Sequence, residues 1–255
     1  MIYSATPHKQ RSEKVEKMKL ICIPHAGGAA SSFLKWKPYL HPSVELMPVE
    51  LAGKGRRFGQ RPYKNVEEAV QDILSVVHKV VADETPYALF GHSMGALLAF
   101  ELLHTVQAEG FHNPVYAFLS GKLPPHYVTE KQRHLLSDEE LWNEVAGMGG
   151  TPVELLASAE SKVFFASVLR HDFQLVETYK IVAGREGLDC PVMVMYGNQD
   201  TLASERAMKE WEDYSNGKIN MHGFDGGHFF IFDNAFEVVN VINEFLLNQI
   251  EKYTG

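Results

Sequence analysis

The pentapeptide Gly91–Gly95 (GHSMG) places a serine between two glycines, at the spacing found around many serine nucleophiles. It follows the apolar run 87–90 and opens an apolar helical run over 96–103, so the sequence predicts a strand, a tight turn and a helix. A serine on such a turn adopts a strained backbone, and the glycines remove side chains that would clash. Because G-x-S-x-G also occurs by chance, this context is what makes Ser93 the candidate nucleophile.

A serine hydroxyl needs a base to take its proton and an acid to orient that base. On a strand–turn–helix scaffold the expected chain order is serine, acid, histidine. The apolar segment 191–196 predicts a buried strand, and the turn after it ends in Asp200. A short strand over 218–221 leads through a glycine-containing turn to His228, which precedes a C-terminal amphipathic helix. We therefore expect His228 to be the base and Asp200 the orienting acid.

Other residues could fill these roles. An aspartate after a strand is also a common turn former or helix cap. Three further aspartates are conceivable substitutes for Asp200, namely Asp172, Asp225 and Asp233. The first sits in an apolar-periodic helix, and the other two lie too close to His228 in sequence to form a separate strand-end acid. Two of the remaining histidines, His25 and His92, are expected to pack or position groups rather than to act as bases.

The negative oxygen of a tetrahedral intermediate needs hydrogen-bond donors. The apolar run 19–23 predicts the first strand, and the small-residue loop 24–30 (PHAGGAA) follows it. Small residues let backbone N–H groups approach a ligand oxygen closely. We expect the amides of Ala26 and Met94 to form the oxyanion hole, with Gly27 as the neighbouring alternative. The spacing matches neither common phosphate-binding glycine motif.

Strands and helices alternate along the chain, which predicts an α/β fold with a mostly parallel central sheet and helices on both faces. Further strands are expected over 44–49 and 115–119, and a helix with a core-facing apolar stripe over 66–81. The expected organisation is a polar N-terminal extension (1–17), a single core domain (18–119 and 189–252) and a helical lid inserted at 120–188.

Within 120–188 the alternation stops. Helical segments are expected over 138–146, 152–157 and 159–182, after the nucleophile and before the acid, where a lid would cover the active site. An additional helical layer without lid function is the alternative. Gly147, Gly149 and Gly150 are candidate hinges.

The sequence resembles the type II thioesterases of nonribosomal peptide and polyketide synthesis, members of the α/β-hydrolase superfamily, over about residues 18–245. The motifs that carry the resemblance are HAGG at 25–28, GHSMG at 91–95, SGKLPP at 120–125, GGTP at 149–152, LRHDF at 169–173 with ETY at 177–179, and GGHF at 226–229. The run 51–57 (LAGKGRR) departs from the Leu-Pro-Gly-Arg-like run that is usual there, which puts only the detail of this loop in doubt.

The resemblance implies an α/β-hydrolase fold and a Ser-His-Asp acyl-enzyme mechanism. The implied substrate is a misprimed or stalled acyl group on the phosphopantetheine thiol of an acyl or peptidyl carrier protein, and no cofactor or metal is implied. Three alternatives stay open. They are a medium-chain acyl-carrier-protein thioesterase that terminates fatty-acid synthesis, a general carboxylesterase, and a non-catalytic carrier-protein-binding module.

Bulk composition agrees with an enzyme of this kind. The 255 residues are 45% hydrophobic and carry a formal charge of −8, which argues against general nucleic-acid binding. Residues 1–17 lack a signal peptide's apolar stretch and no run of about 18 apolar residues occurs, so we expect a cytoplasmic, monomeric protein without membrane contact. Cys22 and Cys190 fall in or beside predicted buried strands, which predicts packed, reduced thiols.

A basic stretch stands out in this acidic chain: Lys54, Arg56, Arg57 and Arg61. Surface charge of this kind usually serves solubility, so a solvated loop is the expectation. The rival hypothesis is that these residues receive an acidic carrier protein or the phosphate of its prosthetic arm.

Overall fold

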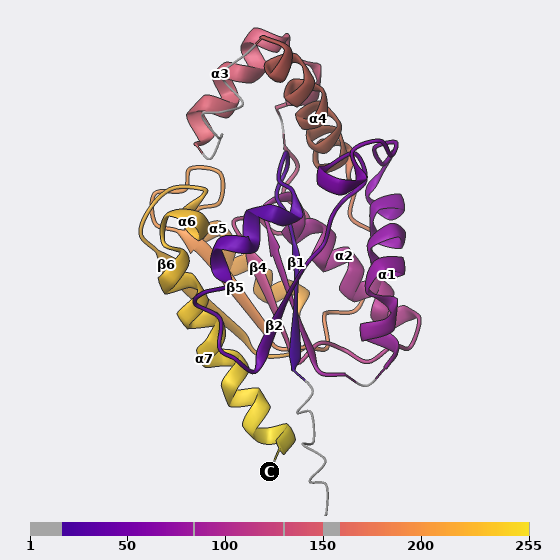
Figure 1. The fold of residues 1–255 in the computed structure, drawn as a ribbon, viewed down its shortest axis with the longest axis vertical. Helices are drawn as coiled ribbons and strands as arrows, with labels where there is room; N and C mark the ends of the chain where they lie inside the picture. Colours follow the sequence, from indigo (N-terminus) through magenta and orange to yellow (C-terminus); the bar gives the residue numbers. More distant parts are fainter. Residues whose placement is uncertain (1–16, 84, 130, 150–158, 255) are drawn as a thin grey trace, which may run out of the picture.

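The computed structural model describes residues 17–83, 85–129, 131–149 and 159–254. A six-stranded sheet in the order β2-β1-β3-β4-β5-β6 forms its centre, and every described strand pairing is parallel. Its strands are β1 (Met18–Ile23), β2 (Val44–Pro48), β3 (Tyr87–His92), β4 (Tyr116–Ser120), β5 (Val192–Gly197) and β6 (Ile219–Phe224). This sheet, with helices on both faces, confirms the predicted α/β-hydrolase architecture (Figure 1).

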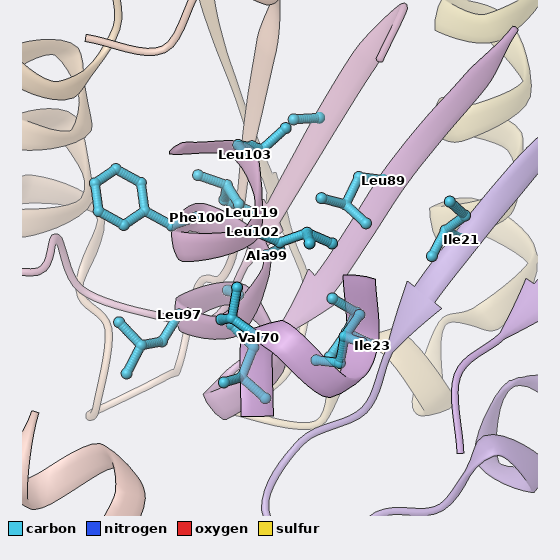
Figure 2. Packing of buried hydrophobic residues seen from close by; sticks show 14 of the residues in the cluster. Ile21, Ile23, Val70, Leu89, Leu97, Ala99, Phe100, Leu102, Leu103 and Leu119 are labelled. Atoms are coloured by element: carbon cyan, nitrogen blue, oxygen red, sulfur yellow. The ribbon is translucent and has the colours of Figure 1, made fainter. Parts of the chain in front are cut away.

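Alternate strand residues face opposite sides of the sheet, and each side has its own apolar cluster. Ile21 and Ile23 of β1 belong to the cluster that packs against α1 (Val66–Ala82) and α2 (Met94–Ala108), shown in Figure 2. Leu20 and Cys22 belong to the cluster on the other face. The elements that contribute to that second cluster are η1 (Ala30–Trp36), α6 (Phe230–Asp233) and α7 (Ala235–Thr254). The core therefore has two apolar layers with the sheet between them.

The two helices that cover the first face form for different reasons. Helix α1 begins after Asn65, whose side chain accepts a hydrogen bond from the Glu68 amide at 2.9 Å, and an apolar stripe of this helix is buried. Helix α2 is apolar on nearly all sides and nearly all of its side chains are buried, which is typical of a helix enclosed by a protein core. Because α2 starts directly after Ser93, this enclosure fixes the position of the candidate nucleophile.

The segment between β4 and β5 contains η3 (Arg133–Leu135), α3 (Asp138–Met148) and α4 (Ala159–Thr178). Figure 1 shows α3 and α4 beyond the carboxyl ends of the strands, at the opposite end of the molecule from the C-terminus. Helix α4 ends four residues earlier than predicted, and the segment predicted as a helix over 152–157 lies outside the described residues, as does Gly150. A lid function for this segment stays a prediction.

The short elements η2 (Gly55–Arg57), α5 (Glu205–Met208) and η5 (Lys209–Tyr214) complete the described structure. Both cysteines are buried free thiols, as predicted, and burial raises the pKa of Cys22 and raises that of Cys190 to about 12. Across the described ranges, no helix combines the length and the apolar character that a membrane crossing requires.

Candidate active site

Ser93 lies between β3 and α2 with φ 55° and ψ −116°, and it is the one non-glycine residue with positive φ in the described part of the chain. Both neighbouring glycines are required by close backbone approach. A Cβ atom on Gly91 would overlap the carbonyl of Gly95, and one on Gly95 would overlap the carbonyl of Ile23. The Ser93 amide donates to the Ser120 carbonyl at 2.8 Å, which ties the turn to β4. The strained serine turn predicted from the sequence is thus present.

The close backbone atoms around Gly95 predict a loss of stability when a side chain is added there. Gly95→Ala should lower the free energy of unfolding by about 3 kcal/mol, because the methyl group meets backbone atoms that cannot rotate away. Gly147→Ala is the matched control, because an added Cβ there meets no atom within 4 Å and alanine stabilises a helix interior by about 0.5–1 kcal/mol relative to glycine. Chemical denaturation of both variants measures the difference. Similar unfolding midpoints would contradict this account of the turn.

The predicted acid and base lie together. His228 Nδ1 is 2.8 Å from Asp200 Oδ2, and both side chains are buried. An ionised carboxylate only accepts hydrogen bonds, so the proton of the ring lies on Nδ1 and Nε2 is left as the acceptor that a general base needs. The other carboxylate oxygen, Oδ1 of Asp200, accepts from the Leu202 amide at 2.8 Å.

Two hydrogen bonds hold the loops that carry this pair. The Gln199 amide donates to the Gly226 carbonyl at 2.9 Å, and the Gly226 amide donates to Gln199 Oε1 at 2.6 Å. Neither loop can therefore shift without the other, which keeps Asp200 and His228 in register. The rival acids have other surroundings: Asp225 accepts from Asn198 Nδ2 at 3.4 Å, Asp233 lines a cavity wall and Asp172 contacts a different loop.

Ser93 and His228 line the same two cavities. Within the described residues no hydrogen bond joins Ser93 Oγ to His228 Nε2. Such bonds are often long before substrate binds and shorten in the complex. The structure thus pairs Asp200 with His228 directly and places Ser93 at a shared cavity with the histidine, while the catalytic roles of all three stay predictions.

His25 and His92 are buried beside this group. Burial lowers the pKa of His25 to about 4 and lowers that of His92 well below its usual value, with the neighbouring His228 adding to both shifts. Both rings are therefore neutral near pH 7. His25 Nδ1 lies 2.9 Å from the Ala26 carbonyl and His92 Nδ1 lies 2.9 Å from Ser120 Oγ. These contacts fit the positioning roles expected for them.

The loop after β1 contains the predicted oxyanion donors. The Gly27 amide already donates to Asp172 Oδ2 at 2.6 Å, so this alternative donor is occupied. Met94 is the first residue of α2, and the first amides of a helix have no acceptor within the helix. The amide of Ala26 has no protein acceptor in the described part of the chain. Ala26 and Met94 remain the predicted oxyanion donors.

The basic stretch differs from the expected solvated loop. Lys54 is only 6% exposed and forms an ion pair with Asp172 of α4. Arg57 forms two hydrogen bonds with Asp72, at 2.6 and 2.7 Å. Two further cations complete the stretch: Arg61, which pairs with Glu68, and Arg56, which is exposed. The expectation was wrong for Lys54 because its partner lies 118 positions away in the sequence, and a local charge pattern carries no signal for such a contact.

Two cavities of different character meet at Ala26, Ser93 and His228. The larger has a volume of about 760 Å³ and a mainly apolar wall that includes Val145, Phe165, Leu169, Phe173, Phe229 and Phe232. The smaller, of about 280 Å³, has a mixed wall in which apolar residues alternate with charged and polar ones, namely Lys122, Tyr127, Thr129, Arg133, Glu177 and Thr201.

Sequence reasoning missed Lys122 as a wall residue of the smaller cavity, although it lies in one of the motifs of the resemblance. Burial lowers its pKa to about 8, and the nearby positive charge of Arg133 adds to this shift. A cation thus lies in the wall of the cavity that contains the candidate nucleophile.

Comparison with known proteins identifies the family of this chain. The thioesterase domain family matches residues 18–246. The gramicidin S biosynthesis protein GrsT of Aneurinibacillus migulanus is 31% identical, and the alignment covers 92% of this chain and 89% of that protein. The crystal structure of ClbQ from the colibactin NRPS/PKS pathway has a TM-score of 0.86 at 31% identity, covering 91% of this chain and 98% of that one.

A third relative is the type II thioesterase BorB from the borrelidin biosynthetic cluster, whose structure has a TM-score of 0.79 at 30% identity and covers 90% of this chain and 93% of its own. These similarities extend over nearly the whole of each protein. The chain therefore belongs to the thioesterase family, as an α/β-hydrolase that acts on thioesters and is similar to the type II thioesterases.

Proposed function

We propose that this thioesterase removes misprimed or stalled acyl groups from the phosphopantetheine thiol of acyl or peptidyl carrier proteins in nonribosomal peptide or polyketide synthesis. The observation that carries the proposal is that Ser93 lines both a larger, mainly apolar cavity and a smaller cavity whose wall includes the charged side chains Lys122, Arg133 and Glu177. A carrier-bound thioester likewise has an apolar acyl group on one side of the reacting carbonyl and an amide-containing, phosphorylated arm on the other. The relatives from gramicidin S, colibactin and borrelidin biosynthesis support this class of substrate.

The proposed reaction is acyl transfer to water. His228 Nε2 takes the Ser93 proton while Asp200 holds the imidazolium that forms, and Ser93 Oγ attacks the thioester carbonyl. The amides of Ala26 and Met94 hydrogen-bond the oxyanion, and His228 returns the proton to the departing thiol. Water, deprotonated by His228, then cleaves the acyl-serine ester and releases the acid. These groups handle every proton transfer, so the proposal includes no metal or organic cofactor.

The test compares one set of acyl groups on a carrier protein and on the small thiol N-acetylcysteamine. We expect kcat/KM to be higher for the carrier-bound thioesters across short and branched acyl groups, because only the full phosphopantetheine arm can contact the charged side chains of the smaller cavity. Rates can be followed by release of free thiol. The same acyl groups as oxygen esters serve as the control.

Three outcomes would contradict the proposal. Equal kcat/KM for carrier-bound and small thioesters would remove the carrier protein as the partner. Oxygen esters cleaved as fast as thioesters would indicate a general carboxylesterase. A steep preference for medium-chain acyl groups would indicate an enzyme that terminates fatty-acid synthesis.

A further inference from the structure

The peptide unit between Ala26 and Gly27 is held at both of its polar atoms. Its N–H donates to Asp172 Oδ2 at 2.6 Å, and its carbonyl oxygen lies 2.9 Å from His25 Nδ1. A neutral ring nitrogen that faces a carbonyl must carry the proton, so the imidazole donates here. Fixing this peptide plane restricts the adjacent plane, which presents the Ala26 amide predicted to bind the oxyanion.

Asp172 is itself held from another segment. The same atom, Oδ2, accepts from Lys54 Nζ, and the side chains of the pair are only 5% and 8% exposed. Three segments that are distant in sequence thus converge on one carboxylate: the loop 24–29, the loop after β2 and helix α4. Removal of two charges from water often costs as much as their attraction returns, so a buried pair is weak evidence for a stabilising role.

Helix α4 also packs directly on this loop. Gly27 has φ 75°, and a Cβ atom there would lie 2.9 Å from both Leu169 Cδ2 and Phe165 Cζ of α4. The helix therefore contacts the loop through apolar side chains as well as through the Asp172 carboxylate. If α4 moved away from the core, the Gly27 amide would lose its acceptor and the loop its apolar support.

We propose that Asp172, paired with Lys54, is a positioning residue that holds the oxyanion loop in its catalytic geometry, so that the oxyanion hole is complete only while α4 is docked on the core. The proposal rests on the proposed acyl-transfer function of the same site. It gives the lysine of the basic stretch an internal role in place of a surface one.

The first test is Asp172→Asn, assayed on a butyryl thioester of N-acetylcysteamine. Loss of a full oxyanion donor costs about 10²–10³ in kcat, so a displaced donor should lower kcat by about 10–100-fold. KM should stay unchanged, because the donor acts on charge that develops in the transition state. Asp138→Asn is the matched control. Asp138 of α3 is an exposed carboxylate that accepts from Arg170 of α4 at 2.7 Å, so this variant also removes a charge paired with α4, and kcat should stay at the wild-type value.

A second variant separates positioning from folding. Lys54→Met combined with Asp172→Leu replaces the buried pair by apolar side chains, which should keep Tm at or above the wild-type value. The expected kcat nevertheless stays at or below that of Asp172→Asn, because leucine offers the Gly27 amide no acceptor, whereas the single carbonyl oxygen of asparagine can still accept from one donor.

Two results would overturn the proposal. The first is a wild-type kcat in Asp172→Asn, and the second is a double variant whose kcat, like its Tm, equals that of the wild-type protein. A wild-type protein that hydrolyses no thioester would instead refute the proposed function and leave the contact geometry untouched.

Discussion

Ser93→Ala should lower kcat for thioester hydrolysis by about 10⁶-fold, the loss seen when a triad nucleophile is removed. The physical reason is that the acyl-enzyme can no longer form, so that only binding and the oxyanion donors assist direct attack by water. The fold should be unaffected, because the backbone strain at this position is accommodated by the glycines on either side. Thiol release under single-turnover conditions with a carrier-bound acyl group measures the loss.

Covalent labelling tests the same assignment independently. A fluorophosphonate should add its mass to the peptide that contains Ser93 in the wild-type protein and should add none in Ser93→Ala. Ser75→Ala is the control. The Ser75 hydroxyl donates to the Asp72 carbonyl on the exposed face of α1, so its loss is expected to change neither labelling nor rate. Retention of more than a few per cent of wild-type activity in Ser93→Ala would show that another group is the nucleophile.

Asp200→Asn should lower kcat by about 10⁴-fold with little change in fold, by analogy with the loss of the corresponding acid in serine proteases. The carboxylate accepts the Nδ1 proton of His228 at 2.8 Å and so fixes the tautomer in which Nε2 is the base. An amide in its place can donate to Nδ1, which puts the ring proton on Nε2 and leaves the imidazolium without a counter-charge. Steady-state kinetics near pH 7 measure the effect.

The control for this prediction is Asp225→Asn. Asp225 lies three residues before His228, but its carboxylate accepts from Asn198. Loss of this exposed contact is expected to change kcat by less than about threefold, since surface substitutions of this kind usually have small effects. A larger loss in Asp225→Asn than in Asp200→Asn would reverse the assignment of the acid.

The order of the site along the chain was predictable because each part depends on local pattern. Ser93 lies between two glycines, and nearby backbone atoms leave no room for a side chain at either of them. The strand before this turn and the helix after it each have a clear hydrophobic pattern. Asp200 and His228 follow short strands at the carboxyl edge of a parallel sheet, where the ends of neighbouring strands meet. The two side chains pair because β5 and β6 are neighbours in the sheet, an order that the structure shows.

The extents of some elements were less predictable. The apolar periodicity of α4 continues to residue 182 in the sequence, but the helix ends at Thr178. Tyr179, the residue directly after the helix, donates to Glu101 of α2 at 2.5 Å, a tertiary contact that the local sequence pattern does not encode. Helix ends depend on such contacts more than helix interiors do.

Sequence alone therefore determined the candidate nucleophile, acid and base, since glycine spacing, strand ends and hydrophobic period are set by sterics over a few residues. Tertiary structure decided the environment around them. It buried Lys54 against Asp172, occupied the Gly27 amide, and placed Ser93 in the walls of a larger, mainly apolar cavity and a smaller one with charged side chains. The physical reason is that a charged or polar group pairs with whichever group is buried beside it. Segments more than a hundred residues apart in the sequence become neighbours only in the folded chain.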